Sequence, residues 1–274
     1  MQTQGRESMP FHRFEDLDSN YLTPHLSTGQ APIIEGRYMY FCRTFKEAGT
    51  GSELHYHPNE LLIFPLSGKI NAVVGNDRRI VSPGTFIHVP AFARHSMKAT
   101  EDGDLSYLYI KDQTWTVVGI AADEAPPETA MSVEEVNRIH QSGVWAGQEK
   151  APENSQAIVD GLGDCYYPIL ASLDAPVASA NRVCLIEGER LAFGFFECPP
   201  GYMRPRGKTA HEEFMYVLSG GLDIQVADES RNAGPGDVIE IPKDSETGFK
   251  VTGETPVRYA AVRSMPYLEM RIDE

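Results

Sequence analysis

The sequence contains no long apolar run. Across its 274 residues, no stretch reaches the roughly 18–20 consecutive apolar residues that a membrane-spanning helix requires. The opening segment, MQTQGRESMPFHRFEDLDSN, is polar and has no apolar core of the kind found in signal peptides. We therefore expect a cytoplasmic protein with no membrane partner.

Basic residues are scarce. The chain has 24 Lys and Arg residues against 39 Asp and Glu residues, which gives a formal net charge of −15 at pH 7. Nucleic acids and anionic membranes bind proteins through basic patches. This charge balance argues against both as partners and leaves a small molecule as the expected ligand.

Cysteine is also rare, and its spacing contains no CxxC-type pair. The four cysteines are widely separated in the chain: Cys42, Cys165, Cys184 and Cys198. Isolated cysteines of this kind are typical of buried free thiols in a reducing cytosol. We expect no disulfide framework.

The most informative feature present is an internal repeat. Short motifs recur at a constant offset of 152 residues: IIEG at 33–36 as LIEG at 185–188, LSG at 66–68 as LSG at 218–220, Pro90 as Pro242, and Tyr107 as Tyr259. A constant offset over such a length, without insertion, indicates two tandem copies of one fold.

Each copy consists of short apolar segments separated by turn residues. In the first copy these include RYMYFCRTF, ELLIFPL, TFIHVP and LSYLYIK, with turns such as SG, GND and SPG. The pattern predicts an antiparallel all-β sandwich or barrel in each copy. The segment 60–66 is apolar on both faces, so one face should meet the interior and the other a second sheet or a subunit. We expect a homodimer or higher homo-oligomer.

The region between the copies has a different character. It contains the linker-like DEAPPETA, the possible exposed loop GQEKAPENSQ, and SVEEVNRIHQSG, which predicts a short helix. Ser132 and Glu135 form a capping box, and Gly143 is a plausible end of the helix. The expected organisation is a first barrel at 1–122, a linker with a short helix at 123–180 and a second barrel at 181–274.

Two histidines lie one residue apart in the first copy, within GTGSELHYHPNELLIFPLSG. Side chains alternate between the faces of a strand, so His55 and His57 point the same way. A third histidine, His95, follows the turn and strand in SPGTFIHVPAFARH. Imidazoles from neighbouring strands can converge inside a barrel as metal ligands.

The spacing of these residues resembles the two sequence motifs of the cupin superfamily, and the tandem arrangement resembles a bicupin. The resemblance covers roughly 34–111 and 186–263. It implies two tandem cupin barrels of the double-stranded β-helix, or jelly-roll, type. It also implies a metal site built from the His-x-His pair, a glutamate and the later histidine, which makes His55, His57 and His95 the expected metal ligands.

The first copy departs from the family pattern at the glutamate. Family spacing puts it at position 61, where this sequence has Leu61. Glu60 is one residue away, and a shift of one residue turns a side chain to the opposite face unless a bulge intervenes. We expect Glu60 to point away from the metal.

The second copy departs at the histidines. The offset of 152 places Gly207, Thr209 and Thr247 where the first copy has its three histidines, and Glu213 opposite Leu61. One carboxylate without imidazoles is a poor transition-metal site, so we expect this barrel to hold no metal; His211 shares the face of Glu213 but lacks partners. Strand parity puts the basic residues of RPRGK on the opposite, solvated face: Arg204, Arg206 and Lys208.

A site of three neutral histidines resembles gentisate-type and β-diketone-cleaving dioxygenases. Such a site keeps the full +2 charge of the metal and leaves positions open, which suits a small anionic substrate such as a dihydroxy-aromatic or dicarbonyl acid. Fe(II) is the favoured metal, with Zn, Mn or Ni possible. The alternatives are a non-redox cupin isomerase, lyase or hydrolase, and a binding module without catalysis.

No catalytic side chain is singled out by the sequence. Leu61, Ile63 and Pro65 should share the inward face of their strand and line an apolar cavity. Polar residues on the first barrel's other strands are candidates for substrate contacts: Tyr38, Tyr40, Arg43, His88, Tyr107, Tyr109 and Lys111. His88 is the most conspicuous because it lies on the strand leading to His95, although a buried hydrogen-bonded histidine explains it equally.

We predict one tightly bound transition metal per chain, because only the first copy has the histidine ligands. Elemental analysis of the purified protein measures the ratio. Thr247→Ala, in the second copy, should leave the metal content unchanged, and two tightly bound metals per chain would contradict the assignment of the second barrel.

Overall fold

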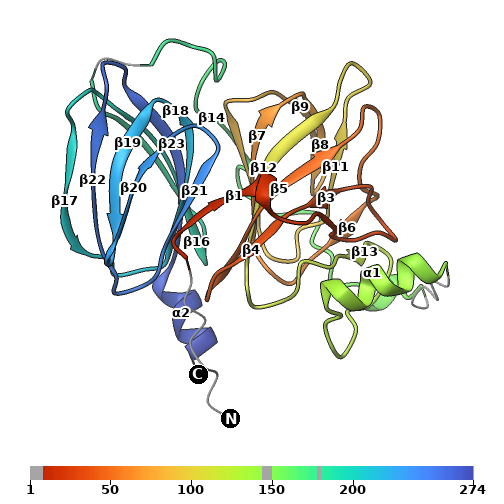
Figure 1. Ribbon diagram of the computed structural model, residues 1–274. Coiled ribbons are helices and arrows are strands. Elements are labelled where there is room, and N and C mark those ends of the chain that lie inside the picture. The colour runs from red at the N-terminus through yellow and green to blue at the C-terminus, as the bar shows by residue number, and fades with distance from the viewer. Residues whose placement is uncertain (1–8, 144–149, 178–179, 274) are drawn as a thin grey trace. The chain divides into compact units, whose positions relative to one another are not determined.

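The computed structural model describes residues 9–143, 150–177 and 180–273. Almost every element in this part of the chain is a β-strand (Figure 1), and its two α-helices are short, α1 (Val133–Ser142) and α2 (Pro266–Asp273). The predicted all-β class is therefore confirmed. None of the described helices has the length and apolar character needed to cross a membrane.

The chain forms two compact units that are not consecutive segments. The N-terminal unit comprises Leu17–Pro176, the short segment Glu187–Ala192, and the described residues from Ser264 onward. The C-terminal unit comprises Phe193–Arg263 together with the described residues of Met1–Asp16 and Val177–Ile186. These units differ from the three segments expected at 1–122, 123–180 and 181–274, because short pieces of chain pack with the unit that is distant from them in sequence.

Two antiparallel sheets make up the N-terminal unit. In spatial order, the larger sheet contains β14 (Tyr166–Pro168), β10 (Thr85–Val89), β7 (Leu61–Ser67), β12 (Leu105–Asp112), β5 (Met39–Lys46), β3 (Gln30–Ala31) and β2 (Asn20–Tyr21), with β4 (Ile33–Glu35) also on β5. The smaller contains β13 (Ile120–Ala121), β6 (His55–Tyr56), β11 (His95–Ala99), β8 (Ile70–Val74) and β9 (Asp77–Val81).

The C-terminal unit repeats this plan. One sheet runs β1 (Phe11–Arg13), β21 (Asp237–Ile241), β18 (Glu213–Ser219), β23 (Val257–Ser264), β16 (Leu191–Cys198) and β15 (Arg182–Glu187). The other runs β17 (Met203–Lys208), β22 (Glu246–Thr252), β19 (Gly221–Val226) and β20 (Glu229–Ala233). Two opposed sheets in each copy agree with the predicted jelly-roll fold.

Strand β12 lies at the centre of the larger N-terminal sheet, and all eight of its residues are buried. Its register places Lys111 beside Leu61 of β7 and Tyr40 of β5. Because side chains alternate along paired strands, the three positions share one face of the sheet. That face carries a core in which Leu61 and Ile63 pack with Tyr107 and Tyr109.

The predicted linker helix is present with its predicted caps. Helix α1 begins after Ser132, whose Oγ accepts a hydrogen bond of 3.1 Å from the Glu135 amide. It ends at Gly143, which has a φ of 68° and so adopts the left-handed conformation that glycine tolerates. Of the predicted loop GQEKAPENSQ, residues 147–149 lie outside the described part of the chain.

All four cysteines are free, as predicted. Cys42, Cys165 and Cys198 are buried, but Cys184 is only partly buried, so the expectation that every thiol is buried was wrong for Cys184. Cys184 lies on β15, whose positions alternate between exposed and partly exposed along an outer strand of its sheet.

Glu60 fixes the segment Glu187–Ala192 to the N-terminal unit. Its carboxylate is 2% exposed and accepts a 2.6 Å hydrogen bond from His88 Nε2. It also accepts three backbone amide hydrogen bonds, from residues 189, 190 and 191 at 3.0, 2.9 and 2.8 Å. Burial alone would raise the pKa of Glu60, but these hydrogen bonds, led by that from His88, outweigh it and hold the pKa below its ordinary value.

We predict that Glu60→Gln lowers the free energy of unfolding at pH 7 by about 3 kcal/mol, because the amide accepts weaker hydrogen bonds and opposes N–H donors with its own NH₂. Equilibrium urea unfolding measures the loss. Since the folded pKa of Glu60 is depressed, its stabilisation is present above the unfolded pKa and is lost as the pH falls through the folded pKa. The difference between parent and variant should therefore shrink in acid.

Glu53→Gln is the matched control for this prediction. The Glu53 side chain is 72% exposed and pairs with Lys98, which is also partly exposed. Exposed ion pairs contribute at most about 1 kcal/mol, so this variant should unfold close to the parent. Equal losses for the two variants would contradict the anchoring role of Glu60.

Candidate metal centre

The structure brings the three predicted histidines together in the N-terminal unit. His55 begins β6, His57 follows that strand, and His95 begins β11 directly opposite His55 in the antiparallel ladder. One ring nitrogen from each lies within 4.8 Å of the others, and all three residues are buried. In the part of the chain that the structure describes, this is the one group of three or more His, Cys, Asp or Glu side chains arranged to hold an ion.

The backbone sets the orientation of all three imidazoles. Each Nδ1 lies within hydrogen-bond distance of a carbonyl oxygen: His55 of Glu53 at 2.8 Å, His95 of Ala93 at 2.8 Å, and His57 of Val118 at 3.3 Å. With the proton on Nδ1, each ring directs the lone pair of Nε2 into the cluster. The Nε2 atoms of His57 and His95 are buried and have no hydrogen-bond partner among the residues that the structure describes. A divalent metal would satisfy them, so the residues fit the group that the sequence predicts.

The electrostatics of the cluster favour neutral ligands. Burial lowers the pKa of His95 to about 3 and lowers the pKa values of His55 and His57 well below their ordinary range, with the neighbouring His95 and Lys111 adding to the effect. All three rings are therefore uncharged at neutral pH, and a metal does not have to displace protons from them.

No carboxylate completes the cluster. Leu61, at the family's glutamate position, is 1% exposed and belongs to the core beside the histidines. Glu60 points to the other face of β7, as expected, and its oxygens are bound by His88 and by backbone amides. The inward orientation expected for Leu61 and Ile63 agrees with their place in this core.

A small cavity lies beside the histidines. Its volume is about 20 Å³, which is room for about one water molecule. The residues that line it include His55, His95, Leu61, Thr44, Tyr107 and Lys46. The cavity is therefore lined by two of the expected metal ligands and by a buried lysine.

Two lysines are buried in this core. Lys46 is 3% exposed and donates a hydrogen bond of 2.6 Å from Nζ to the Met97 carbonyl; Lys111 is fully buried and donates one of 3.2 Å to the Val117 carbonyl. Within the described residues, neither forms an ion pair with a carboxylate. Burial lowers the pKa of Lys46 to about 7 and that of Lys111 well below its ordinary value.

Lys46 was missed by the sequence reasoning, although strand parity contains the signal. Residues 40, 42, 44 and 46 alternate with outward-facing positions along β5, and Cys42 belongs to the core beside the histidines. Lysine is almost never fully buried unless it is paired. A lysine at an inward position of this face therefore indicates a specific structural or functional role.

The other polar candidates divide into two groups. Tyr107, Tyr109 and Lys111 face the core around the histidines, and Tyr40 packs against it. The remaining three are engaged elsewhere and do not belong to the cluster: Tyr38 donates to Asp273, Arg43 to Ser106 Oγ, and His88 bonds Glu60. Alternation along β5 explains the separation of Arg43, which has the opposite parity to Tyr40 and Cys42, whereas Tyr38 precedes the strand.

A further residue that the sequence did not indicate, Gly119, packs directly against the histidines. A Cβ added there would lie 2.7 Å from His55 Cδ2 and 3.0 Å from the Cε1 atom of His57. Its amide donates a hydrogen bond of 2.9 Å to Thr23 Oγ1, which fixes the backbone in this position. The close approach therefore requires glycine because of space, not because of an unusual backbone angle.

In the C-terminal unit, Glu213, at the position equivalent to Leu61, forms an ion pair. Arg204 donates to Glu213 at 3.2 Å, and both side chains are at least partly buried. The expectation that Arg204 lies on the solvated face was wrong, because the register of β17 against β22 shifts between Arg204 and Gly207. Such a bulge reverses the faces of the residues on one side of it. Thr209 and Thr247 both donate to backbone carbonyls.

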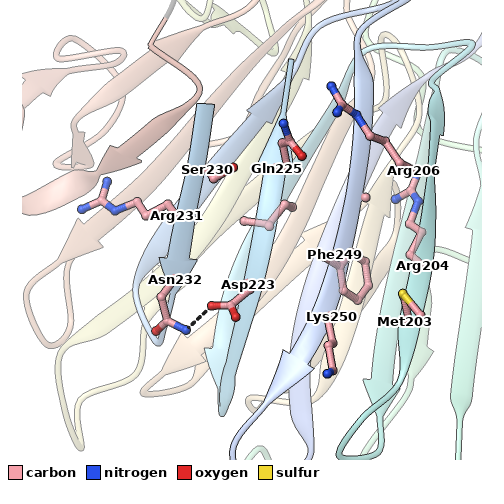
Figure 2. A pocket seen from close by; sticks show the side chains of 12 residues that line it. Met203, Arg204, Arg206, Asp223, Gln225, Ser230, Arg231, Asn232, Phe249 and Lys250 are labelled. Atoms are coloured by element: carbon pink, nitrogen blue, oxygen red, sulfur yellow. Dashed lines mark hydrogen bonds between the residues drawn. The ribbon is translucent and has the colours of Figure 1, made fainter. Parts of the chain in front are cut away.

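The C-terminal unit also has a concave surface of about 530 Å³ on the four-stranded sheet (Figure 2). None of the residues that line it is a histidine. Figure 2 shows Arg206 and Lys250 pointing towards opposite ends of this surface. Asp223 accepts a hydrogen bond of 2.7 Å from Asn232, and Arg206 pairs with Glu246 at 3.1 Å. Its cations do not converge on one point, so we place the candidate site at the histidines.

A family model described as the Cupin domain matches residues 44–111 and 194–263, together just over half of the chain. The protein belongs to the cupin family and, with one domain in each unit, is a bicupin. The matched segments include His55, His57 and His95 in the first copy and Glu213 in the second.

Several solved structures share this fold at low sequence identity. A variant of oxalate decarboxylase from Bacillus subtilis has a TM-score of 0.64 and 19% identity, and the match covers 95% of this chain and 78% of that chain. The same enzyme at pH 4.6 gives 0.63 and 18%, covering 95% and 77%. AerE from Microcystis aeruginosa gives 0.60 and 13%, covering 91% and 97%. No curated protein matches the sequence.

We predict that Gly119→Ala lowers metal affinity by about 10–100-fold, the range seen when groups that orient metal ligands are altered. The methyl group displaces rings whose Nδ1 atoms are held by carbonyls, and the protein should stay folded. Competition with a fluorescent chelator measures the affinity, and circular dichroism checks the fold.

Gly103→Ala is the matched control. A Cβ at Gly103 meets no atom within 4 Å, so only backbone entropy changes. Parent-like metal affinity in both variants would show that contact between residue 119 and the histidines does not position them.

Proposed function

We propose that the protein is a metal-dependent enzyme whose active centre is the three-histidine cluster, acting on a small anionic oxygenated substrate, and that the reaction is a dioxygenase reaction dependent on Fe(II). The observation that carries the proposal is the set of buried Nε2 atoms of His57 and His95, without partners and without a carboxylate beside them. His55, His57 and His95 would hold the metal.

The charge of the surroundings supports an anionic substrate. Three neutral imidazoles leave the charge of a divalent cation uncompensated, and Leu61 contributes no negative charge where the family has a glutamate. Lys46 and Lys111 are buried in the same part of the unit, and so are Tyr107 and Tyr109. An anion entering this core gains favourable interactions that are strong at low dielectric.

Bound iron would supply adjacent open coordination positions for substrate and dioxygen, as in other non-haem iron sites. The protein's own residues orient the histidine ligands and keep other groups out of the site. The carbonyls of Glu53, Ala93 and Val118 hold the ligand tautomers, and Leu61 leaves a coordination position free. Burial raises the pKa of both Tyr107 and Tyr109 above the ordinary value, so these phenols keep their protons and can donate hydrogen bonds to bound oxygen atoms.

A non-redox reaction is the second candidate. Its support is the fold similarity to oxalate decarboxylase, one of whose solved structures is described in terms of its Mn(II) centres. Buried lysines can also act as general acids or bases when their pKa approaches neutrality, as that of Lys46 does. In this case the metal would be Mn, Zn or Ni.

Two measurements separate the candidates. Elemental analysis of protein purified without added metal identifies the resident ion, and oxygen-electrode screening with dihydroxy-aromatic and dicarbonyl acids tests for dioxygen consumption. Oxygen uptake that depends on iron supports the dioxygenase. Turnover that continues without oxygen and with manganese supports the non-redox reaction and overturns the first proposal.

We predict that Leu61→Glu retains metal as well as or better than the parent but loses at least about tenfold in kcat/KM, equivalent to about 1.4 kcal/mol. The carboxylate adds a fourth ligand, reduces the charge that attracts the substrate and occupies a position that the substrate or oxygen needs. Metal titration and steady-state kinetics on one preparation measure both effects.

Leu61→Met is the control, since it conserves approximate volume without adding charge. It should keep most of the activity. If the glutamate variant is as active as the parent, the missing carboxylate is incidental and the three-histidine argument fails.

A further inference from the structure

Lys46 lines the cavity beside the histidines, and the donor capacity of its amine is mostly unused among the described residues. Lys46 Nζ can donate up to three hydrogen bonds when protonated, and within the described residues it makes one, of 2.6 Å, to the Met97 carbonyl. The residue is 3% exposed, and the ring of Tyr107 lies 5.7 Å from Nζ. A buried amine with so few partners is costly to the fold, which points to a ligand.

The position of Lys46 relative to the histidines is well defined. The carbonyl that holds it belongs to Met97, two residues after His95 on β11, and both residues line the same cavity. Lys111 lies differently. Its amine donates to the carbonyl of Val117, and the carbonyl of the next residue, Val118, is the one that holds His57. Lys111 does not line the cavity. The chain thus offers two buried lysines, only one of which faces the space beside His55 and His95.

We propose that Lys46 binds the carboxylate of the substrate, and that the substrate is a short-chain carboxylic acid bearing a second oxygen for the metal, such as a 2-hydroxy, 2-oxo or dicarboxylic acid. This proposal rests on the proposed function, because it assumes that the histidine cluster binds metal. Among the substrates that the proposed function allows, this proposal favours short-chain acids over dihydroxy-aromatic acids.

The size and polarity of the cavity support this choice. A volume of about 20 Å³ accepts about one water-sized group, whereas pockets for larger ligands have volumes of about 300–1,000 Å³. A neutral diketone would leave the amine without a counter-charge. A carboxylate beside Nζ would instead favour the protonated lysine, because an opposite charge stabilises it, and would accept the hydrogen bonds that Nζ does not make within the protein.

The test compares two probes of similar size on Co(II)-loaded protein. Glycolate has a carboxylate and a hydroxyl, whereas ethylene glycol has two hydroxyls and no charge. Changes in the visible Co(II) absorption report binding without turnover. The parent should bind glycolate, and Lys46→Met should bind it at least about tenfold more weakly, as expected for a buried charge-assisted hydrogen bond. Affinity for ethylene glycol should be unchanged.

Lys111→Met is the matched control, since it also removes a buried amine near the histidines. Because its amine donates to the Val117 carbonyl and does not line the cavity, it should weaken glycolate binding clearly less than Lys46→Met does. Equal losses in the two lysine variants would overturn the proposal, because they would indicate a general effect of positive charge and not a contact with Lys46.

The melting temperature distinguishes substrate binding by Lys46 from a purely structural role of this residue. Replacing a poorly partnered buried amine with methionine should leave the melting temperature of the metal-free protein equal or raise it. Lys46→Gln can still donate to the Met97 carbonyl and should lose glycolate affinity as the methionine variant does. It replaces the methionine variant in the test if that variant does not fold. A lower melting temperature with parent-like glycolate affinity would overturn the proposal.

The remaining outcomes distinguish this proposal from the function on which it rests. If the parent binds Co(II) and glycolate, and both Lys46 variants bind glycolate equally well, only the role of Lys46 is overturned. If the parent binds no Co(II) at the histidines, the metal-dependent function itself fails, and the assignment of the substrate class fails with it.

Discussion

The antiparallel pairing of β11 with β6 is the interaction on which the candidate site depends. It sets His95 directly opposite His55, and the alternation of side chains then brings His57 to the same face. Two of the three ligands begin paired strands, and His57 directly follows β6. The backbone carbonyls that fix the ring tautomers lie within two residues of His55 and His95, so the same strands also orient the rings.

This arrangement places an unusual amount of polarity inside an apolar core. Three imidazoles and two amines share the interior with Leu61, Ile63 and the inward face of β12. Each buried polar atom without a partner costs about 1–3 kcal/mol. The surrounding strands compensate: β12 is buried along its full length between β5 and β7, and Glu60 holds a remote hairpin tip through three hydrogen bonds on the opposite face of β7. The stabilising contacts on one face of the sheet thus offset the cost of buried polar atoms without hydrogen-bond partners on the other face.

Features governed by local rules could be predicted from the sequence. The repeat, the all-β class, the capped helix α1 and the histidine cluster follow from spacing, period and capping residues. Features that depend on distant or irregular backbone could not. The partners of Glu60 lie 129 to 131 residues away in sequence, and the bulge that turns Arg204 inward has no sequence signature in RPRGK. Gly119 acts through space alone, and a glycine in a loop gives no indication of which side chains it approaches. Lys46 was within reach of strand parity, but a single lysine on a mixed strand is usually solvated.

The pair of Arg204 and Glu213 shows how the chain itself compensates the charge of a mostly buried carboxylate in the second copy. Glu213 occupies the position equivalent to Leu61, and Arg204 supplies from the chain itself the positive charge that a bound ion would otherwise provide. A cation that is covalently part of the chain cannot dissociate, be chelated or be exchanged for a competing ion. The two copies therefore differ at equivalent positions: the first has three imidazoles and Leu61, and the second has Glu213 paired with the guanidinium of Arg204. The charge balance of this ion pair therefore does not depend on ions in the surroundings.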